Sequence, residues 1–160
     1  MTRPGSVVTR EELLRRAAAW RGEGKTIALA NGLFDLVHVG HLRYLEDAAT
    51  LADVLVVALN DDASARALKG PDRPIVAEQE RAELIAGFRC VTAVTIFGEA
   101  TVEALLRALV PDVHCKGTDY TADTVPERET ARELGIRVAI TGDPKNHATR
   151  DIIKHIRGVP

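Results

Sequence analysis

Five short apolar runs recur along the chain, separated by stretches in which apolar residues repeat with the period of a helix. The expected strands are residues 26–30, 53–59, 91–97, 112–116 and 137–141, and the expected helices are 9–21, 40–51, 77–88, 101–109, 126–134 and 149–157. Strands that alternate with helices are typical of a parallel sheet covered on both faces. The chain is therefore predicted to form an α/β fold: a Rossmann-like, doubly wound, five-stranded parallel sheet in a three-layer α/β/α arrangement.

A length of 160 residues allows one full hydrophobic core, and no linker or internal repeat divides the chain. We predict a single domain over residues 1–160, with a leading helical segment at 1–24 and the core that carries the site at 25–157. A net charge of −2 supplies no basic field for nucleic acid, and no apolar run approaches the roughly 20 residues of a membrane span. Because Cys90 and Cys115 are the only cysteines, no disulfide framework is expected, and the predicted location is the cytoplasm.

The segment from Asn31 to His41 directly follows the first expected strand and reads Asn-Gly-Leu-Phe-Asp-Leu-Val-His-Val-Gly-His. It predicts a glycine turn that brings His38 and His41 to the start of a helix beginning near Gly40. A helix start offers backbone amides and the positive end of the helix dipole, and a glycine allows a phosphate to approach the backbone. We interpret the segment as a site at which the phosphorus of a nucleotide is transferred.

Three roles are open for the histidine pair. In nucleotidyl transfer, charge develops on the oxygens of the attacked phosphorus, and two imidazole N–H groups can stabilise it. Neither ring needs to act as a base, because a phosphate nucleophile is already ionised. Alternatively, the pair would bind zinc together with residues such as His114, Cys115 and His147. A capping or core role is the third possibility.

Polar segments also follow the other expected strands, at residues 60–73, 99–101, 117–120 and 142–149. The carboxyl ends of parallel strands meet at one edge of a sheet, so these segments are expected to surround one site. Lys69 and Arg73 suit phosphate oxygens, and Lys116 with Gly117 and Asp119 suits a nucleotide base, a ribose or a metal. A solvated loop and an ordinary turn are the alternative explanations.

Arg81 and Arg89 lie eight residues apart on the helix expected at 77–88 and its end, so they are candidates to share a face. Asp35 and Asp62 are carboxylates close to the expected site, as the cap of a turn and of a helix. Mg²⁺ usually takes one or two carboxylates together with phosphates and water. The triphosphate is therefore expected to hold Mg²⁺, and no protein metal site is predicted.

The histidine motif resembles the signature of the nucleotidyltransferase superfamily that shares His-x-Gly-His with class I aminoacyl-tRNA synthetases. A wider match over about residues 25–157 resembles its heptose-phosphate adenylyltransferase branch. The residues that carry this match are Asn31, Gly32, Phe34, Asp35, His38, Gly40, His41, Tyr44, Leu45, Leu59, Asn60, Asp62, Ser64, Leu68, Lys69, Gly70, Arg73, Pro74, Arg81, Pro111, Asp112, Lys116, Gly117, Asp119 and Tyr120. This branch is often fused to a sugar kinase, which the sequence does not show, so a stand-alone form is expected.

The resemblance implies an enzyme that joins ATP to D-glycero-β-D-manno-heptose 1-phosphate with Mg²⁺, releasing pyrophosphate and giving ADP-heptose for lipopolysaccharide core. It implies catalytic roles for His38, His41 and Lys69. The nucleotide would lie against Asn31, Gly32, Leu33, Phe34, Gly40, Lys116, Gly117, Asp119, His147, Thr149 and Arg150, and the sugar phosphate against Asp35, Arg73, Arg81 and Arg89. Relatives are commonly dimeric, so a homodimer is expected.

Two positions depart from the family pattern. Thr118 stands where the family usually has a second glycine, and Ala148 replaces the first hydroxyl of a run that receives the β- and γ-phosphates. Thr149 is expected to be the N-cap of the last helix and to bind phosphate, with charge supplied by Lys145 and Arg150.

Two other functions stay open. A cytidylyltransferase would use CTP and glycerol 3-phosphate or another alcohol phosphate, and Arg89 falls where such enzymes carry a substrate-binding arginine. Residues 116–120 and the leading helix argue against it. The second is a nucleotide-binding sensor without turnover, suggested by Ala148, against which the intact histidine pair argues.

Overall fold

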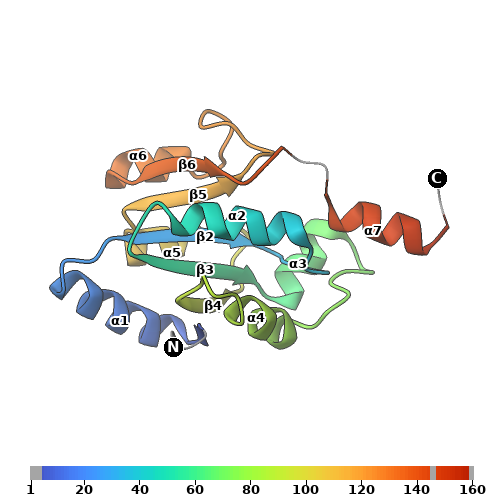
Figure 1. Ribbon diagram of the computed structural model, residues 1–160, viewed down its shortest axis with the longest axis horizontal. Helices are drawn as coiled ribbons and strands as arrows, with labels where there is room; N and C mark the ends of the chain where they lie inside the picture. Colours follow the sequence, from blue (N-terminus) through green and yellow to red (C-terminus); the bar gives the residue numbers. More distant parts are fainter. Residues whose placement is uncertain (1–4, 145–146, 159–160) are drawn as a thin grey trace.

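The computed structural model describes residues 5–144 and 147–158, which form a six-stranded parallel sheet with helices around it (Figure 1). The strands are β1 (Ser6–Val7), β2 (Ile27–Gly32), β3 (Val54–Asn60), β4 (Ala93–Phe97), β5 (Val113–Gly117) and β6 (Arg137–Thr141). The helices are α1 (Arg10–Gly22), α2 (Val39–Ala49), α3 (Asp62–Lys69), α4 (Glu78–Ala86), α5 (Glu103–Leu109), α6 (Arg128–Leu134) and α7 (Thr149–Ile156). This order confirms the expected Rossmann-like α/β alternation.

The sheet has six strands rather than the five that were predicted, because β1 precedes the first expected helix. β1 contains only Ser6 and Val7, which is too short to show an alternating pattern in the sequence. These two residues pair in parallel with Ala93 and Val94 of β4. The leading segment therefore belongs to the sheet and covers part of an otherwise open strand edge.

Helices cover both faces of the sheet because the central strands are apolar on both sides. Every residue of β3 is buried. On one face α1, α5 and α6 pack against side chains such as Leu29 and Val56, and on the other α2 and α4 pack against Ala30 and Val57. The three-layer arrangement follows from this two-sided core.

The order of the sheet, β1-β4-β3-β2-β5-β6, reverses at β2. Along the chain, β3 and β4 are added on one side of β2, and β5 and β6 are then added on the other side of β2. Open α/β sheets bind ligands at such a switch point, outside the carboxyl ends of the strands. The register pairs Ala28 with Val113 and Ala30 with Cys115, and both strands continue beyond that pairing. We call this place the β2–β5 edge; it presents Asn31 and Lys116 from the two strands.

One helix was not among those predicted, whereas the last helix lies where it was predicted. Residues 62–69 form α3, which was missing from the expected helices although Asp62 was interpreted as a helix cap. The cap is Asp61, whose carboxylate accepts the Ser64 amide at 2.7 Å. The last helix, α7, projects from the body of the molecule, and none of its residues is buried (Figure 1). None of the described helices has the length and apolarity needed to cross a membrane.

Candidate active site

His38 and His41 begin α2 and form its cap. His38 is the N-cap, with an extended backbone, and its Nδ1 accepts the Gly40 amide at 3.1 Å. The Nδ1 of His41 in turn accepts the His38 amide at 3.2 Å. The two rings stack, with their centroids 3.9 Å apart. The capping role that the sequence left open is therefore real, and it holds both rings in place.

The cap also determines which nitrogen of each ring is a donor. A ring nitrogen that accepts a hydrogen bond carries no hydrogen, so in a neutral imidazole the hydrogen is on the other nitrogen. Both histidines use Nδ1 as the acceptor. Each therefore presents an Nε2–H on the side of the ring away from the cap. Two donors held in advance are what stabilisation of charge on phosphate oxygens requires.

Gly40 makes room for this arrangement. A Cβ at position 40 would lie 2.9 Å from Cε1 and 3.0 Å from Nδ1 of His38, and 3.4 Å from Cβ of His147. The His38 ring thus occupies the space that a side chain would need. The structure thus shows a role for Gly40 that the sequence did not suggest. Because this residue has no side chain, the His38 imidazole can lie over the first turn of the helix.

The loop between β2 and α2 is held by the buried carboxylate of Asp35. Phe34 and Leu36, on either side of it, have φ angles of 52° and 49°, a conformation that costs on the order of 1–3 kcal/mol for such residues. Asp35 accepts Arg73 Nε at 2.8 Å and the amides of Ile75 and Val76. Burial alone would raise the pKa of the Asp35 carboxyl, but these amides and Arg73 hold the pKa below its ordinary value.

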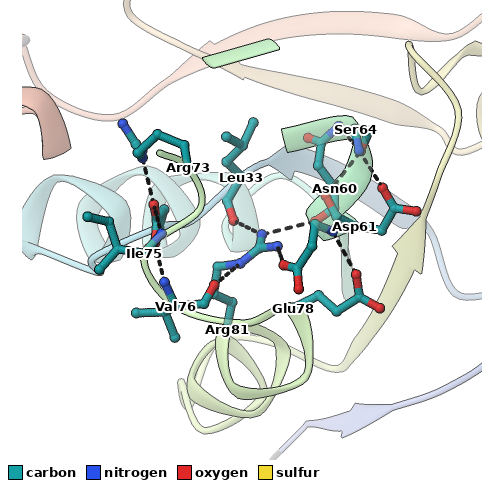
Figure 2. A network of polar contacts seen from close by, with 11 residues as sticks. Leu33, Asn60, Asp61, Ser64, Arg73, Ile75, Val76, Glu78 and Arg81 are labelled. Atoms are coloured by element: carbon teal, nitrogen blue, oxygen red, sulfur yellow. Dashed lines mark hydrogen bonds and ion pairs between the residues drawn. The ribbon is translucent and has the colours of Figure 1, made fainter. Parts of the chain in front are cut away.

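Arg81 is fully buried and joins three segments around the site (Figure 2). Its Nη1 donates to the carbonyls of Leu33 and Asn60, at 2.6 and 2.9 Å. Its Nε donates to the Val76 carbonyl and its Nη2 to the Asp62 carboxylate, both at 2.8 Å. The resemblance implied that Asp35 and Arg81 bind substrate, but both are buried and use their polar atoms inside the protein, which for Asp35 fits the other expected role, that of a turn cap. Their geometry is that of residues which hold the site in shape.

The other basic residues expected to bind phosphate or substrate lie in different settings. Arg73 is largely buried against Asp35, and Lys69 is exposed at the end of α3. Arg89 is exposed and does not share a face with Arg81, because α4 ends at Ala86 and the helical period stops there. Lys69 and Arg89 are therefore open to solvent, and their predicted roles stay predictions.

The aromatic part of the nucleotide segment packs behind the histidines. The Phe34 ring lies 5.4 Å from that of His41 and stacks on Tyr44 at 6.3 Å. A Cβ on Gly32 would lie 3.3 Å from the Phe34 ring. Tyr44, which was not among the expected site residues, donates its hydroxyl to the Cys115 carbonyl at 2.7 Å and so ties α2 to β5.

Lys116, Gly117 and Asp119 follow one another at the end of β5, as expected. Lys116 is buried, with its Nζ 4.6 Å from the centre of the Tyr120 ring. Burial lowers the pKa of the Lys116 ammonium, and the charge of Glu127 opposes that shift. Gly117 is half-buried and Asp119 is exposed. This segment lies directly across the β2–β5 edge from Asn31.

Thr118, one of the two departures from the family pattern, ties neighbouring loops together. Its hydroxyl donates to the Asp143 carbonyl at 2.9 Å. The Asp143 carboxylate also accepts Arg43 of α2 at 2.6 Å. The extra side chain therefore joins the loops after β5 and β6, and links them through Asp143 to α2.

The start of α7 differs from the expected cap. Its N-cap is Ala148, which supplies no side-chain bond, and Thr149 is the first helical residue. The Thr149 hydroxyl instead donates to the Asp35 carbonyl at 2.6 Å, anchoring α7 to the loop before α2. His147 is exposed, with its ring 6.3 Å from that of His38.

A cavity of about 280 Å³ lies between His38 and the apolar side of α7, where it is lined by Ile152 and Ile156. Arg150 is exposed and lies 3.9 Å from the Asp151 carboxylate. Lys145 lies outside the described residues. The structure therefore brings His38, His147 and α7 around one cavity, and Arg150 is not among the residues that line it.

His114 was considered from the sequence only as a possible zinc ligand, and the structure instead places it in the core beside Asn31. It is fully buried in β5, and its Nε2 lies 2.8 Å from Oδ1 of Asn31. A polar residue inside an apolar strand next to the switch point is the signal that could have identified it. Among residues 5–144 and 147–158, no group of three or more His, Cys, Asp or Glu side chains is arranged to hold a metal ion.

Comparison with known proteins gives consistent matches. A family model described as cytidylyltransferase-like matches residues 29–155. The chain is 48% identical over 154 residues to the bifunctional protein HldE of Azorhizobium caulinodans, and 44% identical over 147 residues to that of Syntrophotalea carbinolica. These alignments cover 96% and 92% of this chain but only 32% and 30% of the relatives, so the chain spans about a third of their length.

A similar solved structure is the lipopolysaccharide core biosynthesis protein from Thermoplasma volcanium GSS1. It superposes with a TM-score of 0.66 at 25% sequence identity. The superposition covers 76% of this chain and 100% of that chain.

Proposed function

Since the chain belongs to the cytidylyltransferase-like family, we propose that it transfers the adenylyl group of ATP to D-glycero-β-D-manno-heptose 1-phosphate. The observation that carries the transfer reaction is the pair of Nε2–H donors fixed at the start of α2, beside the switch point of the sheet. The heptose acceptor is supported by the sequence resemblance over residues 25–157, by the HldE relatives and by the structural neighbour from lipopolysaccharide core biosynthesis.

In the proposed reaction, an oxygen of the sugar phosphate attacks the α-phosphorus of ATP in line with the leaving group. A bond forms between that oxygen and the α-phosphorus, and the bond to the bridging oxygen breaks, so that pyrophosphate leaves with the electron pair. His38 and His41 donate to the oxygens on which charge accumulates. Lys69 and the start of α7 are proposed to hold the phosphates, since Lys69 is exposed and α7 begins close to His38.

Mg²⁺ is part of the proposal as a companion of the triphosphate. Both oxygens of Asp35 accept hydrogen bonds inside the protein, so this carboxylate is not a ready ligand. Phosphate oxygens and water would supply most of the coordination, as Mg²⁺ commonly prefers. When bound, the ion neutralises charge on the phosphates. A cytoplasmic location and a homodimer are also proposed; light scattering of the purified protein tests the dimer.

The test measures pyrophosphate release with ATP or CTP, each combined with heptose 1-phosphate or glycerol 3-phosphate, in the presence of Mg²⁺. Release with ATP and the heptose supports the proposal, whereas preference for CTP and glycerol 3-phosphate replaces it with cytidylyl transfer. Nucleotide binding without release by any combination would instead indicate a sensor.

His38→Asn separates catalysis from capping, because asparagine is a favoured N-cap residue but lacks the imidazole donor. We expect kcat to fall about 10²- to 10³-fold, as when an oxyanion donor is removed. Circular dichroism should show the helix content unchanged. A variant with wild-type turnover would refute the assigned role of His38.

A further inference from the structure

His114 and Asn31 meet on one face of the sheet, at the β2–β5 edge. The register pairs His114 with Leu29, and Asn31 lies two residues further along β2. The side chains of His114 and Asn31 therefore project from the same face of the sheet. Their side chains are 2.8 Å apart, between Nε2 of the imidazole and Oδ1 of the carboxamide. This contact runs diagonally across the two strands, from His114 within their backbone pairing to Asn31, the first residue of β2 beyond it.

The surroundings of His114 decide the direction of the hydrogen bond. The ring is fully buried, and its Nδ1 has no partner among the described residues. A buried N–H without an acceptor is rarer and costlier than an acceptor without a donor. The hydrogen therefore belongs on Nε2, which donates to Asn31 Oδ1. Burial, helped by the charge of Lys116, also lowers the pKa of His114 to about 3, so the ring stays neutral.

This bond fixes the orientation of the Asn31 carboxamide. With Oδ1 turned to His114, the Nδ2 amino group is the branch that remains for a ligand. The described part of the chain gives Nδ2 no hydrogen-bond partner, yet Nδ2 is absent from the buried unpartnered atoms, so it reaches solvent. Asn31 immediately precedes Gly32 and the loop that carries the histidine pair.

We infer that His114 is a positioning residue, which turns the Asn31 amino group outward as a donor to an acceptor atom of the bound nucleotide. The inference rests on the proposed function for the identity of the ligand. It specifies that the nucleotide atom at this position is an oxygen or an unprotonated ring nitrogen. A donor group at the same position would face the amino group and be disfavoured.

The test measures the Kd of ATP by calorimetry, without an acceptor substrate. His114→Leu removes the donor, and we expect Kd to rise about tenfold, as for the loss of one oriented hydrogen bond. His114→Gln places an amide N–H near the Nε2 position and should recover most of the affinity. Thr95→Val, which removes another buried hydroxyl without a partner on β4, should leave Kd unchanged.

A double-mutant cycle distinguishes positioning from general loosening of the sheet. In an Asn31→Ala background, His114→Leu should have no further effect on Kd. An equal effect in both backgrounds, or a folded His114→Leu variant with wild-type affinity, overturns the inference. Wild-type protein that binds ATP but releases no pyrophosphate overturns the proposed transfer alone.

A measurement on the unmodified protein covers the case in which His114→Leu fails to fold. Nitrogen-15 NMR should show His114 as the Nε2–H tautomer, and ATP should shift the side-chain amide signal of Asn31. An Nδ1–H tautomer, or an Asn31 amide signal unaffected by saturating ATP, overturns the inference.

Discussion

Replacing Arg81 by methionine should destabilise the protein strongly. Methionine keeps much of the buried stem but removes the guanidinium, so the carbonyls of Leu33, Asn60 and Val76 and the Asp62 carboxylate all lose a charged donor. Breaking such a buried polar arrangement from one side costs about 3–5 kcal/mol. Since domains of this kind are stable by about 5–15 kcal/mol, the loss is a large share of the total.

Urea unfolding followed by circular dichroism measures the change in unfolding free energy. Arg89→Met is the matched control, because Arg89 is an exposed arginine just beyond the end of the same helix. Its unfolding free energy should stay within about 0.5 kcal/mol of the wild type. A change below about 1 kcal/mol for Arg81→Met, with an unaltered m-value, would show that the buried network is not a main source of stability.

Three further predictions concern the histidines and α7. Gly40→Ala places a Cβ 2.9 Å from the His38 ring, and the displaced ring should lower kcat by about 10²-fold, as measured by pyrophosphate release. Burial lowers the pKa of His114 to about 3, so as pH falls below about 6.5 only the unfolded chain protonates this group. Between about pH 7 and 4.5 the unfolding free energy of the wild type should therefore fall by about 2–3 kcal/mol more than that of His114→Leu, as measured by urea unfolding at both pH values. Thr149→Val removes the bond to the Asp35 carbonyl and should speed amide exchange in α7 several-fold without changing exchange in β3.

The central sheet could be read from the sequence because its longer strands are mainly apolar and each is followed by a polar segment, as β3 shows with six apolar residues before Asn60. β1 could not, since two residues carry no period, and α3 was hidden because its sequence, Asp-Ala-Ser-Ala-Arg-Ala-Leu-Lys, is mostly polar or small. The position of the histidine pair was also predictable, because it depends on a local motif that follows a strand.

The partners of individual polar side chains could not be predicted in the same way. Asp35 meets Arg73 across 38 positions of sequence, and Arg81 meets Leu33 across 48. The family resemblance implied that Asp35 and Arg81 bind substrate, whereas long-range packing places both side chains inside the protein. Thr149 was likewise expected to be a cap, because hydroxyls favour that role. Its hydroxyl instead donates a hydrogen bond to the carbonyl of Asp35, in a loop far away in the sequence.

The arrangement at the start of α2 restricts the class of acceptor. Each Nδ1 lone pair is already engaged by a backbone N–H, and each Nε2 already carries a hydrogen. The rings consequently have no basic nitrogen with which to deprotonate an attacking hydroxyl. For the proposed reaction, this arrangement favours acceptors that arrive as anions, as phosphate monoesters do at neutral pH, over free alcohols, for which the two rings supply no base.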